Sequence, residues 1–397
     1  MGKHNLLYLC YWGLSDGLTQ ATAFPHLQLL LNSERINKVV FITIERNGNT
    51  VVTYPILMHP KIVFVPLISK GLKPSILNKI NDFLIFPSQL RGIVAKYKID
   101  KVIARGAPAG ALMLTVCRNR NIPLYVESFE PHADYMLTSG VWKRWDPRYI
   151  FQKKWEAEIK KKALGLMPVA ENYTSLLKKE GVPKQKLFTV PCSVNHNQFI
   201  YDSEKRMQLR TKLNIPIDVH VGIYVGKFGG IYFEDDAFLL FKRILNVSNT
   251  HIIILTPDSK EKIKGRLIEF ELPQNRFHID CVSHLEVSDY LSCADFAFSL
   301  HKRTRVSFYY SPIKNGEYWA AGLPVIISED IGDDSELVKK NNCGNVLPYD
   351  WKQKPDTFFK EMIQDLTSMN RSKIRTVALT YRNVQSCVDA YSHFQLI

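Results

Sequence analysis

The 397-residue sequence has no apolar stretch approaching the roughly 18 residues that a membrane-spanning helix needs. Its apolar start, residues 6–12, lacks a long basic flank and an A-x-A-like cleavage site, so it is predicted to be a first strand and not a signal peptide. The seven cysteines, an odd number without a C-x-x-C pair, argue against a disulfide framework and against a structural zinc site. The expected compartment is therefore a reducing cytoplasm.

Two common phosphate-binding signatures are also missing: the G-x-x-x-x-G-K-S/T of P-loops and the G-x-G-x-x-G of dinucleotide-binding turns. The sequence contains no repeat with a period of about 20–50 residues and no low-complexity tract. With 46% hydrophobic and 23% charged residues, the chain has the composition of a folded globular protein. At about 100–200 residues per domain, its length predicts two domains, or at most three.

Negative charge is scarce only in the first half of the chain. Residues 1–200 carry 27 Lys and Arg against 13 Asp and Glu, whereas residues 201–397 carry 25 of each kind. The formal charge of +14 therefore lies entirely in the first half. This asymmetry predicts two domains with different partners, and the partner of the first half is expected to be anionic.

Short apolar runs alternate with helical stretches in both halves. The predicted strands are 5–12, 38–45, 61–68, 101–105, 123–129, 165–169, 186–191, 219–225, 250–256, 276–282, 296–300 and 324–328. Runs that are apolar nearly throughout are typical of parallel strands covered on both faces. The alternation predicts two doubly wound α/β domains that bind ligands at the carboxyl ends of their strands.

Two segments fall outside this alternation. The polar residues 195–210 are the predicted linker between the halves. Residues 51–58 are predicted to form a hairpin or an extra strand beside residues 39–44, with residues 47–49 (Asn-Gly-Asn) as the turn.

A glycine-rich turn follows the strand predicted at 219–225. Gly226, Gly229 and Gly230 fall within five residues, and a helix with an acidic start follows. Glycines let backbone amides approach a phosphate, a helix N-terminus adds a positive dipole end, and Lys227 adds a full charge. The spacing favours phosphate binding and an ordinary crowded βα turn about equally.

A second string, residues 311–326, reads Ser-Pro-Ile-Lys-Asn-Gly-Glu-Tyr-Trp-Ala-Ala-Gly-Leu-Pro-Val-Ile. Pro312 and Gly322 bracket a predicted helix on which Lys314 and Glu317 share one face. A carboxylate near a helix start can accept both hydroxyls of a ribose, while the lysine meets a phosphate. The spacing by itself fits a surface ion pair better.

Read as a whole, residues 311–326 resemble the nucleotide-sugar signature of GT-B glycosyltransferases, especially those of family 4. The resemblance continues through residues 331–338 and 344–346 and takes in the loop at 224–230, so it covers roughly residues 220–350. It implies a GT-B architecture, with two doubly wound Rossmann-like domains facing a central cleft. The implied parts are an acceptor domain at 1–195, a donor domain at 196–370 and a last helical segment at 371–397 that returns to the first domain.

The resemblance also implies roles for single residues. Glu317 would bind the ribose of the donor, and the remaining implied donor-binding residues are Gly226, Lys227, Gly229, Gly230, Ser311, Pro312, Ile313 and Lys314. Tyr309 stands where the family usually has an acid, and Tyr232-Phe233 stands where it often has a base. Lys302 and Arg303, after the strand at 296–300, are predicted to supply the missing charge. No metal or other cofactor is expected, since lysines and helix dipoles neutralise the diphosphate in such folds, and Asp333-Asp334 is interpreted as helix capping.

Candidate catalytic and acceptor residues follow strands of the basic half. Glu127, Glu130 and His132 are the catalytic candidates, because similar enzymes often place a histidine here, close to the transferred sugar. A lone histidine in a loop is otherwise more often a surface residue. The predicted acceptor-side residues are Ser15, Asp16, Gly17 and Arg105.

Half of the six tryptophans lie within residues 142–155, interleaved with five cations. Amphipathic aromatic residues beside Lys and Arg suit an anionic membrane surface, although a helix that packs its aromatics inward explains the pattern slightly better. The residues predicted to contact a membrane are Trp142, Lys143, Arg144, Trp145, Lys153, Lys154 and Trp155.

The sequence thus predicts an enzyme that transfers a sugar from a nucleotide diphosphate sugar to a hydroxyl of a glycan or lipid-linked acceptor. The expected setting is cell-surface polysaccharide or glycolipid synthesis in the cytoplasm, with peripheral contact to the inner face of the cell membrane. Family 4 resemblance implies retention of the anomeric configuration. The alternatives are a nucleotide-sugar epimerase of the same fold and a non-catalytic basic nucleic-acid-binding protein; the transferase interpretation expects no nucleic acid.

Overall fold

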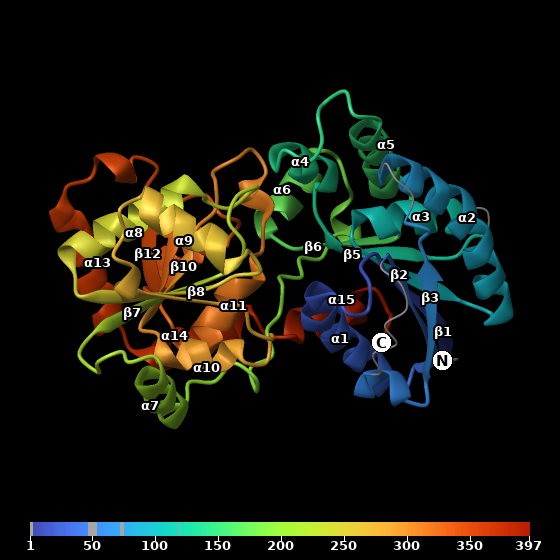
Figure 1. Ribbon diagram of the computed structural model, residues 1–397. Helices are drawn as coiled ribbons and strands as arrows, with labels where there is room; N and C mark the ends of the chain where they lie inside the picture. The colour runs from blue at the N-terminus through green and yellow to red at the C-terminus, as the bar shows by residue number, and fades with distance from the viewer. Residues whose placement is uncertain (1–2, 47–53, 72–74, 119) are drawn as a thin grey trace. The chain divides into compact units, whose positions relative to one another are not determined.

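The computed structural model describes residues 3–46, 54–71, 75–118 and 120–397. The chain divides into two compact units (Figure 1): unit 1 comprises Met1–Cys192 with Val384–Ile397, and unit 2 comprises Ser193–Asn383. Each unit contains one six-stranded sheet with parallel strands and helices packed against it. The predicted pair of doubly wound α/β domains is therefore confirmed.

In unit 1 the strand order is β3-β2-β1-β4-β5-β6. The strands are β1 (His4–Cys10), β2 (Ile36–Glu45), β3 (Ile62–Ile68), β4 (Lys101–Arg105), β5 (Leu124–Phe129) and β6 (Gly165–Pro168). The helices are α1 (Gly17–Asn32), α2 (Ser75–Lys96), α3 (Ala107–Cys117), α4 (His132–Thr138), α5 (Pro147–Lys162), α6 (Glu171–Lys179) and α15 (Gln385–His393).

In unit 2 the order is β12-β11-β10-β7-β8-β9. The strands are β7 (His220–Val225), β8 (Thr250–Leu255), β9 (Phe277–Asp280), β10 (Phe296–Ser299), β11 (Val325–Ser328) and β12 (Gly344–Leu347). The helices are α7 (Ser203–Lys212), α8 (Asp235–Val247), α9 (Lys260–Glu269), α10 (Val287–Cys293), α11 (Ile313–Ala320), α12 (Asp334–Asn341), α13 (Asp356–Ser368) and α14 (Arg371–Tyr381).

Successive side chains of the strands in unit 2 pack on opposite faces of the sheet, into two separate hydrophobic cores. Val221 and Ile223 of β7 pack with residues of α10, α11 and α14, whereas Tyr224 packs with residues of α8 and α13 on the other face. Burial on both faces is why these strands are apolar nearly throughout.

In both sheets the strand order switches direction next to the first strand of the unit. The switch lies between β1 and β4 in unit 1 and between β7 and β10 in unit 2, and doubly wound sheets bind ligands at such points.

The predicted linker at 195–210 overlaps helix α7, which runs from Ser203 to Lys212. Arg206 and Arg210 both pair with Asp295, at N–O distances of 2.7 and 2.8 Å, and the Arg210 side chain is only 2% exposed. Asp202 caps the helix by accepting from the amides of Glu204 and Lys205. The polar residues of this segment thus hold a packed helix, and composition alone does not distinguish such a helix from a linker.

The predicted continuous helix at 371–391 is two helices. Helix α14 stays in unit 2, where Arg375 donates to the carbonyl oxygens of His196 and Phe199 at 2.9 and 2.8 Å. Only residues from Val384 onward, including α15, belong to unit 1. The units therefore meet in sequence at 192/193 and 383/384, against the predicted 195/196 and 370/371.

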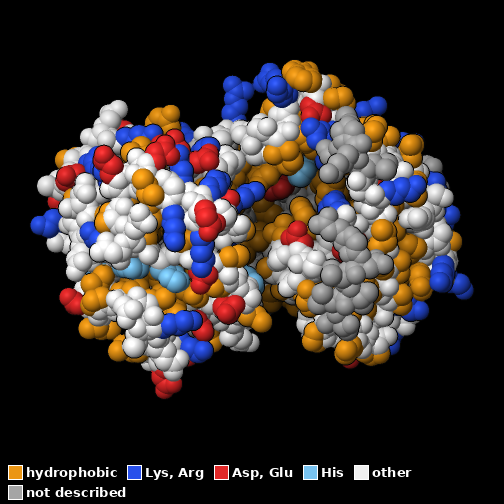
Figure 2. Space-filling view, in the orientation of Figure 1, with side chains coloured by type: hydrophobic (Ala, Val, Ile, Leu, Met, Phe, Trp, Pro, Cys, Tyr) orange, Lys and Arg blue, Asp and Glu red, His pale blue; other side chains and the backbone are white. Residues whose placement is uncertain are grey.

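Two predicted strands are not found among the described residues. Residues 186–191 form an isolated bridge from Leu187 to Leu166, and of residues 51–58 the structure describes 54–58, where Pro55–Met58 is a short 3-10 helix. The predicted turn at 47–49 lies outside the described residues. Within the described residues, no helix has both the length and the apolar character needed to cross a bilayer. Figure 2 shows acidic and basic side chains interspersed over the visible face of unit 2, in agreement with its balanced charge.

Candidate functional site

The glycine-rich turn of unit 2 is a braced loop with one cation at its surface. The Gly226 amide donates to the Leu255 carbonyl oxygen at 2.9 Å, and the Phe228 amide donates to Asp258 Oδ2 at 3.2 Å. Gly229 has a φ of +81°, in the left-handed region that favours glycine. The Lys227 side chain is exposed, so its charge is available to an anion at the loop.

Helix α11 carries a buried carboxylate with two basic partners. The Glu317 side chain is 1% exposed; its Oε2 lies 2.7 Å from Lys314 Nζ and its Oε1 lies 2.9 Å from His284 Nε2. Burial alone would raise the pKa of Glu317, but the Lys314 charge and the hydrogen bond from His284 outweigh it and lower the pKa. Glu317 is therefore a buried anion whose partners, about one-third exposed each, face solvent.

The loop and the helix meet at one edge of the sheet. The Val225 amide, at the end of β7, donates to the Tyr318 hydroxyl on α11 at 3.3 Å. His284 follows β9, and Asp258 follows β8. The carboxyl ends of three neighbouring strands and the first turns of α11 thus surround one region, beside the point where the sheet changes direction.

Three other predicted donor residues lie at the start of α11. Pro312 occupies the N-cap position without a capping hydrogen bond, and Ile313 begins the helix. The Ser311 hydroxyl accepts a hydrogen bond from Arg382, which also pairs with Asp334. Ser311 thus helps to hold the end of α14.

The interpretation of residues 333 and 334 as helix capping holds by position for Asp333 and is wrong for Asp334. Asp333 is the N-cap residue of α12, although its side chain makes no capping hydrogen bond. Asp334 is 2% exposed and bonds to Arg382 and to Asn315 Nδ2, at 2.7 Å for the latter. The acid therefore belongs to a buried ion pair that joins α11, α12 and the end of α14.

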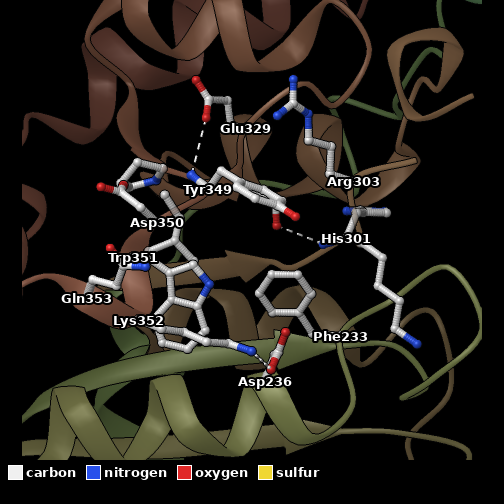
Figure 3. A pocket seen from close by; sticks show the side chains of 14 residues that line it. Phe233, Asp236, His301, Arg303, Glu329, Tyr349, Asp350, Trp351, Lys352 and Gln353 are labelled. Atoms are coloured by element: carbon white, nitrogen blue, oxygen red, sulfur yellow. Dashed lines mark hydrogen bonds and ion pairs between the residues drawn. The ribbon is translucent and has the colours of Figure 1, made fainter. Parts of the chain in front are cut away.

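Lys302 and Arg303 line a different hollow on the same sheet edge, a cavity of about 320 Å³. Figure 3 shows the rings of Phe233, Tyr349 and Trp351 turned toward this space. Arg303 pairs with Asp330 at 2.6 Å, and its guanidinium lies 5.4 Å from the centre of the Tyr349 ring. Glu317, Lys314 and Lys227 do not line this cavity, but the Lys302 amide donates to the Ile231 carbonyl oxygen at 2.7 Å, directly after the glycine loop.

In unit 1, two predicted ligand-facing residues are core residues, and this corrects their assignment. Glu127 is fully buried, and its carboxylate contacts Arg105 Nη1 at 2.7 Å, His26 Nδ1 at 3.0 Å and the hydroxyls of Tyr391, at 2.7 Å, and Tyr8. Arg105 is 4% exposed. Neither side chain is exposed to a ligand.

The same acid takes part in a possible metal-ligand set. His26, Glu127 and Cys387 offer ligand atoms within 4.8 Å of one another. The Arg105 guanidinium already neutralises the carboxylate and would repel a second cation. Burial also raises the pKa of the Cys387 thiol well above its usual value, which disfavours the thiolate that a metal requires.

The other acceptor-side and catalytic candidates lie nearer the surface. Ser15, Asp16 and Gly17 are exposed, and Asp16 caps α1 by accepting from the Leu18 amide at 2.8 Å. His132 begins α4 and is 9% exposed, with its Nδ1 3.9 Å from a Glu130 carboxylate oxygen. Of the three catalytic candidates, Glu130 and His132 therefore remain close together and Glu127 does not reach the surface.

The residues predicted to contact a membrane are likewise partly exposed and partly buried. Trp145 is 72% exposed, and Lys143, Arg144 and Lys154 are exposed as well, whereas Lys153 pairs with Asp134 at 2.9 Å. Trp155 is half-buried. Trp142 is only 4% exposed and packs against His132, so its assignment to a flat contact surface is wrong. Figure 2 shows basic and hydrophobic side chains together above α4 and α5 of unit 1.

No family model matches the sequence, and no curated protein matches it. Among solved structures, sucrose-phosphate synthase from Thermosynechococcus elongatus is similar with a TM-score of 0.75, over 99% of both chains at 16% identity. HepE from Anabaena, in complex with UDP-glucose, has a TM-score of 0.70 over 99% of this chain and 100% of its own, at 11% identity. The fold is GT-B. A protein from Listeria monocytogenes assigned as a UDP-N-acetylglucosamine 2-epimerase shares this GT-B fold, with a TM-score of 0.60 and 12% identity over 99% and 97% of the chains.

Two members of the unit 2 site were not foreseen from the sequence. His284 lies 33 positions before its partner Glu317, and Asp258 lies 30 positions after its partner Phe228. Both follow strands that end at the ligand edge of the sheet, and that position was the only available signal. The GT-B signature indicated Glu317 and left its partners unspecified.

Proposed function

We propose that the chain is a glycosyltransferase that binds a nucleotide diphosphate sugar in unit 2 and transfers the sugar to a hydroxyl of a glycan or lipid-linked acceptor. One observation carries the proposal: the buried Glu317, with Lys314 and His284, adjoins the glycine loop at the ligand edge of a GT-B sheet. Because HepE was solved with UDP-glucose, a uridine diphosphate sugar is the first donor to test.

In this proposal, Lys314 exchanges its bond to Glu317 for a bond to the diphosphate. The freed carboxylate oxygen then accepts a ribose hydroxyl, and His284 keeps the other oxygen in place. Lys227 and the amides of the glycine loop neutralise the leaving diphosphate, so transfer is expected to persist in EDTA. Retention of configuration and transfer of a hexose follow from the family resemblance and are part of the proposal.

Calorimetry with UDP and uridine tests the site. Glu317→Ala should abolish binding of both ligands, since the carboxylate contacts the ribose that they share. Lys227→Ala should weaken UDP by roughly 10- to 100-fold, a loss of about 1.5–3 kcal/mol for a charge-assisted hydrogen bond, and should leave uridine unchanged.

The matched control is Glu336→Ala. Glu336 also pairs with a lysine three residues away, at 2.9 Å, but on the exposed face of α12. Its variant should bind UDP as the wild type does. Unchanged UDP affinity in Glu317→Ala, or equal losses of UDP and uridine in Lys227→Ala, would contradict the proposed site.

A nucleotide-sugar epimerase is the second candidate, because one similar GT-B structure carries that assignment. An epimerase converts the donor without an acceptor and releases no free UDP, whereas a transferase releases UDP in proportion to added acceptor. Salt-sensitive binding of an oligonucleotide that UDP-sugars do not affect would instead favour a nucleic-acid-binding protein.

We further propose a cytoplasmic protein that contacts the inner face of the cell membrane and acts in polysaccharide or glycolipid synthesis. The support is the positive charge of the first half and the exposed Lys143, Arg144, Trp145 and Lys154. Anionic lipid is the expected binding partner of this surface.

A further inference from the structure

Unit 1 contains an open, mostly apolar cavity of about 430 Å³. It lies among residues that follow β1, β4 and β5, next to the point where this sheet changes direction. Its size falls in the range of small-ligand pockets. The lining residues that matter most to its chemistry are Lys79, Phe83, Trp142, Arg148, Phe151 and Trp155.

Aromatic rings from α2 and α5 form the cavity walls. The Phe83 and Phe151 ring centres are 4.9 Å apart, and those of Phe151 and Trp155 are 6.0 Å apart. Two polar wall residues are already engaged: Gln152 donates to Glu156 at 3.2 Å, and the Thr115 hydroxyl donates to a backbone carbonyl at 2.7 Å. A polar glycan would therefore find few free groups here, while a hydrocarbon chain would find continuous apolar contact.

Two cations lie at this apolar cavity. Lys79 Nζ lies 4.7 Å from the centre of the Trp142 ring, and Arg148 lies on the same ring at 5.8 Å. Asp146 pairs with Arg148 at 2.6 Å and neutralises it, whereas Asp82 is held by the Ser69 hydroxyl at 2.8 Å, so Lys79 is the cation that can receive an anion. Burial, with the charges of Arg148 and Arg46, lowers the pKa of Lys79 to about 8, so a bound anion would relieve the repulsion.

The rim of the cavity is apolar and exposed. Ile80 and Leu84 of α2 are 51% and 74% exposed, and Phe151 of α5 is 41% exposed. Exposed apolar side chains around a hollow are typical of a binding surface. An apolar cavity with an apolar mouth and the Lys79 charge matches an amphiphile with an anionic head.

We propose that this cavity binds the hydrocarbon chain of an acceptor glycan that is joined to a lipid through phosphate, with the phosphate held by Lys79. The proposal rests on the proposed transferase function and names its acceptor class. A lipid acceptor would also explain why a neutral donor unit is joined to a strongly basic unit 1.

Octyl phosphate is the probe, titrated into the full chain below its micellar concentration and followed by tryptophan fluorescence and calorimetry. It should bind saturably and at least tenfold more tightly than 1-octanol or inorganic phosphate, since only octyl phosphate satisfies both halves of the site. Lys79→Met should weaken the binding of octyl phosphate about tenfold and so remove its preference over 1-octanol. Lys96→Met, the same change farther along α2 outside the cavity lining, should not.

Thr115→Phe, which fills the cavity without a change of charge, should abolish binding of octyl phosphate and octanol. Leu84→Asp, at an exposed rim position, should also weaken octyl phosphate and carries little risk to folding. Binding of octyl phosphate no tighter than inorganic phosphate, or binding untouched by Thr115→Phe and Leu84→Asp, would overturn the proposal.

The tests of this proposal and of the proposed function give distinguishable results, because the octyl phosphate titration contains no nucleotide. If the protein binds UDP but does not bind octyl phosphate, the lipid cavity alone is refuted. If it binds octyl phosphate but does not bind UDP, the transferase function alone is refuted. Thr115→Phe is expected to retain binding to phosphatidylglycerol vesicles. Loss of vesicle binding in that variant would assign the cavity to a bilayer lipid instead.

Discussion

His301, in the loop directly after β10, is a histidine that the fold keeps neutral. It is 6% exposed, its Nδ1 is buried without a hydrogen-bond partner, and the rings of Tyr232 and Tyr310 lie nearby, at 4.8 and 6.3 Å between centres. Burial lowers the pKa of His301 to about 4, because the imidazolium ion would lose its hydration. Folding therefore disfavours protonation at this position.

This histidine predicts a loss of stability in mild acid. Between the unfolded pKa of about 6.5 and the folded pKa of about 4, the unfolded chain binds one proton more, so stability falls as pH decreases, by up to about 1.4 kcal/mol per pH unit. His301→Leu should remove this part of the dependence. Urea unfolding at pH 8 and pH 5 measures it: the variant should lose less stability between these values than the wild type does, and an equal loss would contradict the assignment.

Two glutamates show what spacing reveals about a residue. Lys314–Glu317 and Glu336–Lys339 are both i,i+3 pairs with N–O distances below 3 Å, and in each pair the two residues share a helix face. The carboxylate of Glu317 is 1% exposed, whereas that of Glu336 is 75% exposed. Spacing predicted the contact in the first pair. The burial depends on how α11 packs, and only the longer signature singled it out.

At the scale of elements, one buried carboxylate joins five of them in unit 1. Arg105, the last residue of β4, is the register partner of Glu127 in β5, so both strands present a charge at the same level. Glu127 also contacts His26 of α1, Tyr8 of β1 and Tyr391 of α15. Strand ends were predicted to face a ligand, but α15, from the far end of the chain, supplies Tyr391 to this cluster. Sequence patterns do not reveal such a distant partner.

Glu127→Gln should destabilise unit 1 by about 3–5 kcal/mol, because it leaves the buried Arg105 charge without its counterion. Tyr391→Phe removes a single hydrogen bond and should cost about 0.5–1.5 kcal/mol. Denaturant unfolding of both variants checks the order of these effects. If Glu127→Gln instead kept wild-type stability and lost activity, Glu127 would be a catalytic residue in spite of its burial.

Across the whole molecule, the features that follow from alternating apolar runs were predictable, and those that follow from distant packing were not. The two sheets and nearly all of their strands could be predicted, because buried parallel strands are apolar throughout. The helix over residues 203–212 was missed, because ion pairs with Asp295 hold a polar segment that composition marks as a linker. The break between α14 and α15 was missed as well, since both halves of the segment have helical sequences.

The uneven charge of the whole chain predicts membrane binding through unit 1. Its residues Lys143, Arg144, Trp145 and Lys154 are exposed, so co-sedimentation should require anionic vesicles and should weaken with added salt, which screens exposed charges beyond about 8–10 Å. Changing the three cations to Ser should reduce binding strongly, because each contributes about 1 kcal/mol near an anionic surface.

The matched control for that variant removes three charges elsewhere on the same unit. Lys160, Lys161 and Lys162 end α5, where Lys160 pairs with Glu180 at 2.5 Å and Lys162 with Glu158 at 3.1 Å. Their triple Ser variant has the same net charge but keeps Trp145 and its neighbouring cations, so it should retain most of the binding. Equal losses in the two variants would mean that total charge, and not the surface at residues 143–154, attracts the membrane. Equal binding of the wild type to neutral and anionic vesicles would contradict an electrostatic contact altogether, and the positive charge of unit 1 would then serve a soluble anion.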